Sequence, residues 1–225
     1  MHTGSDTIRV WDLPTRLFHW LLVGCIIGSV VTSQIGGNAM VWHFRFGFAI
    51  ASLLLFRLVW GLIGGRWSRF ASFLYSPRTV LRYLKGQGAP EHAIGHNPLG
   101  AASVFAMLVI LVAQVSTGVV SDDEIAAFGP FAKFVSSNTV SLATTYHKSY
   151  GKFMLIALIA LHLLAIAYYY FAKRDNLVRP MLAGDKTVTT GPLPGSRDDA
   201  VSRLAAAMVL VACSGLVTWG VSLGG

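Results

Sequence analysis

The stretch TTYHKSYGKFMLIALIALHLLAIAYYYF, at positions 144–171, decides the fold of this chain. The 20 residues that follow Lys152 are all uncharged, and most of them are apolar. About 20 apolar residues cross a bilayer as an α-helix, because a helix satisfies its own backbone polar groups inside the hydrocarbon. Two histidines, His147 and His162, lie in this one segment. The segment therefore predicts a transmembrane helix that carries ionisable side chains at membrane depth.

The rest of the chain has the composition of a membrane protein. Of its 225 residues, 54% are hydrophobic and 12% are charged, and the mean hydropathy is +0.58. Soluble domains carry about twice that share of charged residues. We therefore predict an all-α integral membrane helical bundle, with a four-helix core and a fifth, C-terminal transmembrane helix. The predicted spans are 17–35, 43–64, 99–120, 147–171 and 203–222.

Cysteine content and net charge exclude several other classes of protein. Two cysteines without a CxxC pair rule out a disulfide framework, thiolate-held iron–sulfur or zinc sites, and covalent haem attachment through CxxCH. A net charge of +8 would suit nucleic acid, but the basic residues lie between apolar runs. We therefore expect no nucleic-acid partner and relate the basic residues to membrane topology.

Lys and Arg are unevenly divided between the two sides of the predicted bundle. The N-terminal arm and the 66–98 and 173–203 loops together hold thirteen of them, whereas the opposite side holds one, Lys133. Lys and Arg collect on the cytoplasmic side of a membrane. The N-terminus is therefore expected in the cytoplasm and the C-terminus in the periplasm. The polar stretch 184–200, GDKTVTTGPLPGSRDDA, is expected to be a flexible cytoplasmic linker.

Four histidines lie in or at the ends of predicted spans, where ionisable groups are costly and commonly functional. His147 and His162 are 15 residues apart on one helix, which corresponds to about 22 Å of rise and about 60° of net rotation. With the orientation above, His43 and His147 lie at the outer depth, and His19 and His162 lie at the inner depth. We expect these to be two pairs, although each histidine taken alone could equally be a hydrogen-bonded packing residue.

Imidazole pairs at two depths suit b-type haems. Haem iron takes one axial ligand on each face of the ring, so two pairs would hold two haem b groups and their iron. Zinc or copper would instead gather three or four ligands at one depth. Gly47 and Gly151 each follow a predicted ligand by four residues and would let a flat porphyrin approach the helix. Taken alone, ordinary small-residue packing explains these glycines better.

Two arginines in the second span are candidates for binding haem propionates. Arg57 lies near the inner depth and Arg45 near the outer depth, and a buried arginine needs an anion. The alternatives are snorkelling to the membrane surface for Arg57 and lipid phosphate for Arg45. His96 opens the third span and could contact a propionate or a quinone. As a fifth axial ligand it is a weaker candidate, because no partner histidine is left over for it.

Five stretches of the sequence carry a family resemblance: VWDLPTRLFHW (10–20), FRLVWGLIGGRWSRFASF (56–73), GHNPLG (95–100), TTYHKSYGKFMLIALIALH (144–162) and KRDNLVRPMLAGDK (173–186). Together they resemble the bacterial di-haem cytochrome b561 family, and closely also the cytochrome b subunits of membrane nickel–iron hydrogenases. The resemblance implies that the four span histidines are axial haem ligands, with a quinone pool and a redox partner at the two ends of the electron path. Many members of the family space the two histidines of the fourth span by one residue fewer. A π-bulge would absorb the extra residue.

The sequence therefore predicts transmembrane electron transfer through two haem b groups in the bacterial inner membrane, surrounded by lipid. Electrons would pass between quinone and a partner such as a periplasmic cytochrome c or a dehydrogenase subunit. The alternative is a superoxide:quinone oxidoreductase, which is an enzyme in its own right. A third hypothesis is a non-redox membrane anchor or metal transporter. The expected division is 1–178 for the di-haem core, 179–202 for the linker and 203–225 for the last helix.

Overall fold

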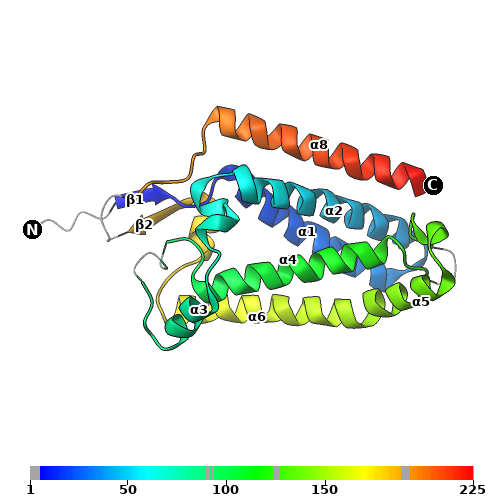
Figure 1. Cartoon of the computed structure of the whole chain (residues 1–225), viewed down its shortest axis with the longest axis horizontal. Coiled ribbons are helices and arrows are strands. Elements are labelled where there is room, and N and C mark those ends of the chain that lie inside the picture. The colour runs from blue at the N-terminus through cyan, green and yellow to red at the C-terminus, as the bar shows by residue number, and fades with distance from the viewer. Residues whose placement is uncertain (1–5, 90–91, 93, 124–126, 189–192, 225) are drawn as a thin grey trace, which may run out of the picture. The chain divides into compact units, whose positions relative to one another are not determined.

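The computed structural model describes residues 6–89, 92, 94–123, 127–188 and 193–224. Most of this part of the chain is helical (Figure 1). In chain order the elements are β1 (Asp6–Arg9), α1 (Leu13–Ile35), α2 (Met40–Ile63), α3 (Pro77–Leu84), α4 (Pro98–Gly118), α5 (Ser137–Thr145), a π-helix (Tyr146–Gly151), α6 (Lys152–Phe171), α7 (Val178–Ala183), β2 (Asp185–Val188) and α8 (Ala200–Gly224). Short 3₁₀ turns lie at Gly37–Ala39, Arg66–Ser68, Phe70–Ser72 and Ala132–Phe134.

Five helical stretches in the described residues are long and apolar enough to cross a membrane. They are Leu13–Ile35, Gly37–Ile63, Pro98–Gly118, Ser137–Phe171 and Ala200–Gly224. Each contains most of one predicted span, so the prediction of an all-α integral membrane bundle is confirmed. Large apolar side chains on these helices are exposed in the isolated chain, for example Leu62 at 72% and Val211 at 71%. A surface of this kind is suited to lipid rather than to water.

Asp12 determines where α1 begins. Its Oδ1 accepts a hydrogen bond from the backbone N–H of Thr15 at 2.9 Å, which is the bond of a helix N-cap. Its Oδ2 accepts from the backbone N–H of Gly65 at 2.9 Å and from Trp60 Nε1 at 3.2 Å. Asp12 is fully buried. Its carboxylate therefore both starts α1 and binds the segment that follows α2.

The chain forms two compact units, each built from three segments. The first unit comprises Met1–Leu17, Arg57–Phe105 and Leu161–Ala207, and the second comprises Phe18–Phe56, Ala106–Ala160 and Met208–Gly225. In the first unit β1 and β2 pair antiparallel, with Arg9 opposite Asp185 (Figure 1). An apolar cluster contains residues of both strands and of the neighbouring loops: Ile8, Val10, Trp11, Ile94 and Val188.

The expectation of a flexible linker over 184–200 is wrong for the described part of that stretch. Residues Asp185–Val188 form β2, which pairs with the N-terminal arm. Ser196 donates its backbone N–H to Arg9 O at 2.6 Å and its Oγ hydrogen to Val10 O at 2.8 Å. The last helix begins at Ala200, three residues before the predicted boundary. The ordering partner is the distant N-terminal arm, so local composition gave no sign of it.

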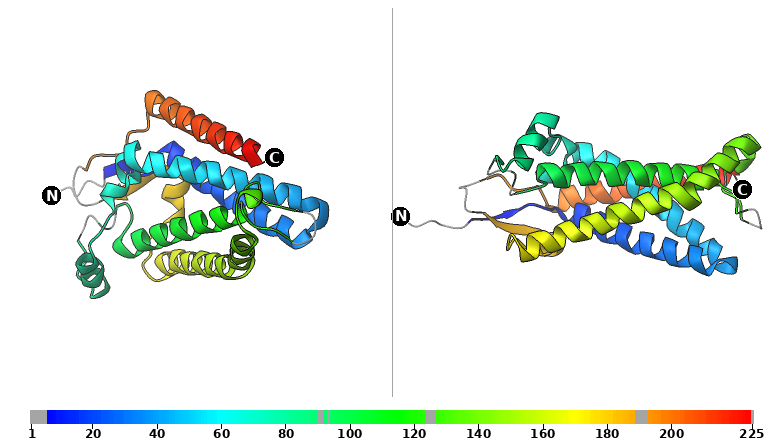
Figure 2. Two further views of the ribbon diagram at one scale, coloured as in Figure 1. Left: turned by 45° about the vertical axis from the view of Figure 1, so that its right-hand side comes forward. Right: turned by 90° about the horizontal axis from the view of Figure 1, so that it is seen from below.

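The second unit has a four-helix core. Buried apolar residues from α2, α4 and α6 meet there, namely Ile50, Leu54, Leu111 and Leu155, with Leu22, Cys25 and Ile26 of α1 packed against them. On the fourth span, α5 runs on through the π-helix into α6 (Figure 2). A π-helix, the feature that could absorb the extra residue of this span, is present at Tyr146–Gly151, and His147 lies within it.

Candidate functional site

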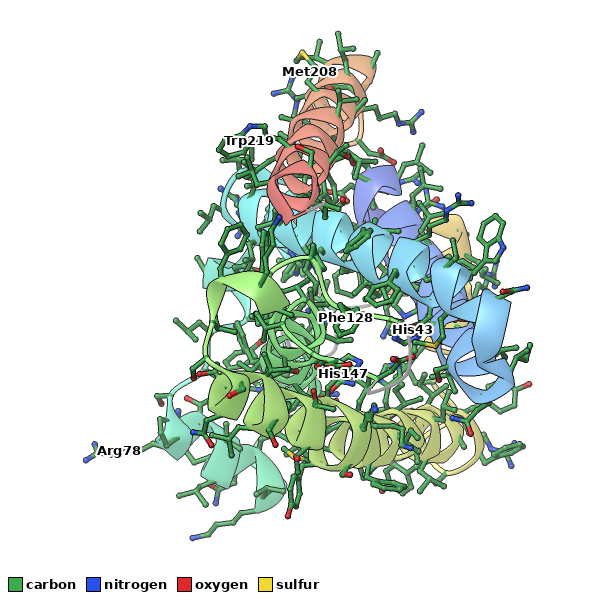
Figure 3. The ribbon with its side chains drawn as sticks, turned by 90° about the vertical axis from the view of Figure 1, so that its right-hand side faces the viewer. His43, Arg78, Phe128, His147, Met208 and Trp219 are labelled. Carbon is green, nitrogen blue, oxygen red and sulfur yellow. The ribbon has the colours of Figure 1, made fainter. Side chains whose placement is uncertain are left out.

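His43 and His147 face each other in the second unit. His43 lies near the start of α2, and His147 lies in the π-helix before α6. Their ring centroids are 6.0 Å apart, and the ring planes make an angle of 87°. Figure 3 shows the two side chains pointing toward one another from their separate helices. The structure thus brings together the two histidines that the sequence pairs at the outer depth.

The Nδ1 atom of each ring is bound to a backbone carbonyl. His43 Nδ1 donates to Ser29 O of α1 at 2.9 Å, with Ser29 Oγ also 3.1 Å away. His147 Nδ1 donates to Gln114 O of α4 at 2.8 Å. A carbonyl oxygen only accepts hydrogen bonds, so Nδ1 must carry the hydrogen in both rings. Neutral rings in this tautomer have the lone pair on Nε2, which is the arrangement of metal-binding histidines with an oriented ring.

The spacing of the two rings fits one iron atom with two axial imidazoles. Metal–nitrogen bonds of about 2 Å, with each ring centre about 1 Å beyond its nitrogen, place two axial ring centroids roughly 6 Å apart. The 6.0 Å separation of His43 and His147 agrees with this value. Within the described residues, no group of three or more His, Cys, Asp or Glu side chains could hold a metal ion. Two axial ligands to an iron held by a porphyrin fit this donor set better than a zinc or copper centre.

The two glycines expected beside the porphyrin differ in their surroundings. A Cβ added at Gly47 would meet nothing within 4 Å, whereas a Cβ at Gly151 would collide with Gln114 Oε1. Gly47 therefore keeps the open space that the sequence predicted. The space at Gly151 is occupied by the Gln114 side chain.

Sequence reasoning missed the residues that hold these rings in place. Gln114 and Gly118 lie one turn apart on α4, and both contact His147: Gln114 Nε2 donates to His147 O at 2.9 Å, and a Cβ at Gly118 would lie 2.7 Å from His147 Cε1. Ser29 supplies the corresponding carbonyl for His43. The only sequence signal was an amide side chain in an otherwise apolar span, followed four residues later by glycine.

The other two predicted ligands lie in different units. His19, on α1, belongs to the second unit, and its ring contacts Trp20 at a centroid distance of 4.9 Å. His162, on α6, belongs to the first unit. The pairing of His19 with His162 therefore stays a prediction.

Arg57 and His96 lie in an aromatic region of the first unit. The Arg57 guanidinium is 3% exposed and stacks on Phe70, with Cζ 4.6 Å from the ring centroid. The His96 ring lies 4.3 Å from the Phe73 ring and 4.7 Å from the Trp11 ring. Arg57 NH1 and His96 Nδ1 are buried and have no hydrogen-bond partner among the described residues. Two buried nitrogens in this state fit an acceptor that the described residues do not supply.

The electrostatics of the same region keep His96 neutral. Burial of the ring and, to a smaller extent, the positive charges of Arg57 and His162 together lower the pKa of His96 to about 3. His96 therefore lies near the predicted ligand His162. A neutral imidazole with hydrogen on Nδ1 would be a donor toward an anion.

Arg45 occupies a different environment. It is exposed, and its Cζ lies 4.7 Å above the Trp42 ring. This stacking leaves its predicted role at an outer haem propionate as a prediction. Lipid phosphate remains the alternative for a cation in this position.

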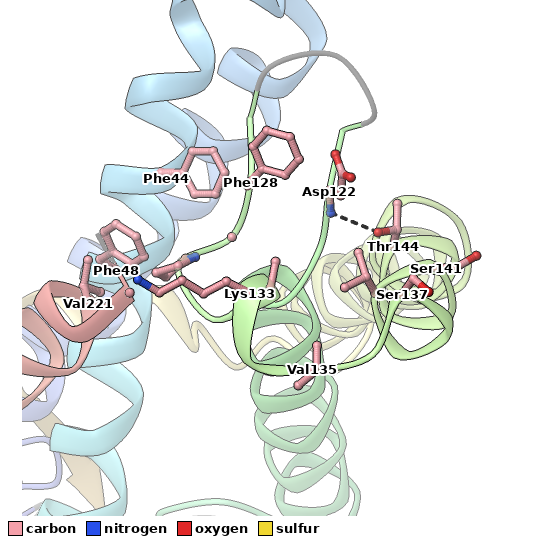
Figure 4. Close-up of a pocket in the computed structure, with 15 residues that line it drawn as sticks. Phe44, Phe48, Asp122, Phe128, Lys133, Val135, Ser137, Ser141, Thr144 and Val221 are labelled. Carbon is pink, nitrogen blue, oxygen red and sulfur yellow. Dashed lines mark hydrogen bonds between the residues drawn. The ribbon is translucent and has the colours of Figure 1, made fainter.

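An amphipathic hollow of about 730 Å³ lies in the second unit (Figure 4). Its apolar wall includes Phe44 and Phe48 of α2 and Val221 of α8, and its polar wall carries hydroxyl groups of α5 together with Lys133. The Phe44 ring also contacts the His43 ring, at a centroid distance of 6.1 Å. Phe44 therefore lines the hollow and also contacts one histidine of the pair.

Comparison with known proteins shows which family this chain is similar to. The model of the prokaryotic cytochrome b561 family matches residues 10–184. The chain is 26% identical over 166 residues to the probable Ni/Fe-hydrogenase 1 B-type cytochrome subunit of Escherichia coli K12, covering 60% of this chain and 69% of that protein. It is 24% identical over 221 residues to the probable Ni/Fe-hydrogenase B-type cytochrome subunit of Bradyrhizobium diazoefficiens, covering 81% and 87%.

The family match covers most of the chain, including all five quoted stretches except the last residues of KRDNLVRPMLAGDK. The fold, the histidine pair and the match agree on a multi-pass bacterial membrane protein that transfers electrons by means of haem b. The chain belongs to the prokaryotic cytochrome b561 family.

Proposed function

We propose that this chain carries electrons through two haem b groups between the membrane quinone pool and a protein redox partner. One haem would have His43 and His147 as axial ligands, and the other would have His19 and His162. The observation that supports this most strongly is the His43–His147 pair, with a ring separation of 6.0 Å and both Nδ1 hydrogens directed at carbonyls.

When bound, haem b supplies an iron that alternates between ferrous and ferric states and carries one electron at a time. The role of the chain is to fix the ligands. The carbonyls of Ser29 and Gln114 orient the two rings and leave each Nε2 for the iron. With His43 and His147 both holding the iron, the haem would pass electrons and would not bind a substrate at the metal.

At the other haem, Arg57 and His96 would bind a propionate. Both present a buried nitrogen without a partner in the described chain, and the stacking of Arg57 on Phe70 keeps the guanidinium in place. A carboxylate would satisfy both donors and neutralise the buried arginine.

The relatives and the hollow support the proposed partners. The relatives are named as B-type cytochrome subunits of Ni/Fe-hydrogenases, which supports a hydrogenase or another dehydrogenase as the partner, ahead of a cytochrome c. The hollow beside Phe44 suits a quinone, because a quinone has a flat ring with two carbonyl oxygens and an apolar tail. Its aromatic wall and its hydroxyl groups match those parts.

Haem content and ligand variants test the proposal. Pyridine haemochrome analysis of the purified protein should give two haem b per chain, and redox titration should resolve two components. His43→Ala and His147→Ala should lose the same component, and His19→Ala and His162→Ala should lose the other. Loss of the same component in His43→Ala and His162→Ala would show that the pairing is wrong, and an absence of haem would refute the function.

A further inference from the structure

We propose that Gln114 is a positioning residue that holds His147 in its ligand orientation by bracing the π-helix. This inference rests on the proposed function, because it assigns a task to a residue beside the proposed haem ligand. Gln114 neither contacts a metal nor has an ionisable side chain. It acts through the segment that carries His147.

Three contacts join Gln114 to the π-helix. The Gln114 Nε2 hydrogen is donated to His147 O at 2.9 Å, and Gln114 O accepts the hydrogen of His147 Nδ1 at 2.8 Å. The third contact is at Gly151, where an added Cβ would collide with Gln114 Oε1 in its present position. Gln114 thus forms hydrogen bonds with both the backbone and the ring of His147, and the absence of a side chain at Gly151 leaves space for the Gln114 amide.

The π-helix needs such support because its geometry is rare and is less favourable than that of an α-helix. Each residue of an α-helix is rotated by about 100° from the one before. If the segment relaxed to a regular α-helix, the extra residue would turn the His147 ring by about that angle relative to the helix that follows. The ring would then point away from His43. A bond to a carbonyl of the π-helix opposes this relaxation.

Gly118 allows the His147 ring to pack closely against α4. It lies four residues after Gln114, on the same face of the helix, and a Cβ at this position would lie 2.7 Å from His147 Cε1. Gln114 Oε1 is buried and has no hydrogen-bond partner in the described part of the chain. An amide in this setting costs free energy relative to leucine if packing is its only task. The bond to His147 O supplies the reason for its presence.

The test compares Gln114→Leu with Ser52→Ala, a control in the same unit that also removes a buried polar group from a membrane-spanning helix. Ser52 Oγ donates to Phe48 O within α2 at 3.0 Å. Iron with two axial histidines has no open position for carbon monoxide, whereas iron that has lost His147 has one. Reduced Gln114→Leu should therefore bind carbon monoxide at up to half of its haem, and its ferric electron paramagnetic resonance spectrum should show one altered low-spin signal. Ser52→Ala should match the wild type in both measurements.

If Gln114→Leu fails to accumulate, Gly118→Ala provides a second test, because its methyl group would press on the same ring. It should alter the same haem component as His147→Ala. The inference fails if both variants keep wild-type spectra without carbon monoxide binding, or if the altered component is the one lost in His162→Ala. The four histidine variants could lose haem components in the two expected pairs while Gln114→Leu keeps the wild-type spectra. That outcome would reject this inference and leave the proposed function intact.

Discussion

At the scale of the residue, the hydrogen-bond partner of Nδ1 determines which ring nitrogen a proposed ligand histidine keeps for a metal. Depth and spacing along the sequence predicted that His43 and His147 would meet, and they lie 6.0 Å apart. The acceptors of their Nδ1 hydrogens, Ser29 O and Gln114 O, were not predictable. Every residue has a carbonyl, so a backbone acceptor leaves no mark in the sequence.

Arg57→Leu tests the role of a single buried charge. A cation beside a haem favours the reduced state, because adding an electron lowers the positive charge of the site. Removing the cation should lower the midpoint potential of the haem held by His162 by roughly 40–90 mV, which corresponds to about 1–2 kcal/mol after screening. Both haems should be retained, and redox titration measures the shift.

The control for this variant is Arg66→Leu. Arg66 is exposed and also lies beside an aromatic ring, with Cζ 5.7 Å from the Trp67 ring centroid. Its replacement should leave both potentials unchanged. Two unchanged potentials in Arg57→Leu would favour snorkelling over propionate binding, and a shift of the other haem would overturn the depth assigned to Arg57.

At the scale of the element, the fourth span shows how spacing can predict an irregular helix. The separation of His147 and His162 by 15 residues, one more than in many relatives, suggested a π-bulge. The structure places the π-helix at Tyr146–Gly151, around His147 itself. The sequence could not predict which end of the span holds it, because that depends on Gln114, on another helix.

Deletion of Ser149 should convert this irregular segment to a regular α-helix. Ser149 is exposed and lies inside the π-helix, so its removal takes out the extra residue without emptying the core. The deletion variant should keep both haems and should make Gln114→Leu harmless, because no π-helix remains to be braced. Carbon monoxide binding by the double variant at the level of Gln114→Leu would contradict this expectation.

The stretch just before α8 makes contacts that local sequence does not reveal. Asp198, in this stretch, accepts hydrogen bonds from Leu13 N at 3.1 Å and from Arg203 Nε at 3.0 Å. Desolvation acts to raise the pKa of Asp198, but hydrogen bonds from Arg203 and Leu13 and the charges of Arg203 and Arg9 outweigh it and lower the pKa. The carboxylate therefore stabilises the contact between the N-terminal arm and the start of α8.

Asp198→Asn should lower the free energy of unfolding by about 1–3 kcal/mol, because it removes charged hydrogen bonds at a side chain that is only 6% exposed. The folded-state pKa is depressed, so this stabilisation is present above the ordinary Asp pKa of about 3.9 and is lost as the pH falls through the lower folded value. Thermal melting in detergent should show a constant gap between wild type and variant from about pH 5 to 8, narrowing below about pH 4.

Asp199→Asn is the matched control for this measurement. Asp199 pairs with Arg197 at 2.7 Å, but the Asp199 side chain is 52% exposed. Its Oδ1 accepts from Ser202 N at 2.7 Å, and asparagine can keep this capping bond. A loss of melting temperature as large as that of Asp198→Asn would show that the buried carboxylate has no special role.

At the scale of the whole molecule, hydropathy predicted the number and rough limits of the spans because a bilayer imposes one physical rule on every helix. The resemblance of the quoted stretches predicted the family. We did not predict the contacts of the 193–199 stretch, nor those of Gln114 and Gly118 with His147. Each of these contacts joins segments that are far apart in the chain. The thirteen-to-one division of Lys and Arg predicts the orientation, which the fold leaves open.

Orientation can be measured with single cysteines in a variant without the native Cys25 and Cys213. Lys133→Cys and Arg82→Cys place a thiol at exposed positions on opposite predicted sides. Basic residues are retained in the cytoplasm during insertion, so Arg82 should lie inside and Lys133 outside. A membrane-impermeant maleimide applied to intact spheroplasts should label Lys133→Cys and should label Arg82→Cys only after lysis.

A periplasmic reporter fused after Gly225 should be active, because an odd number of spans places the two termini on opposite sides. The reverse labelling pattern would invert the assignment of inner and outer haem, whereas correct labelling with an inactive reporter would show that α8 does not cross the membrane.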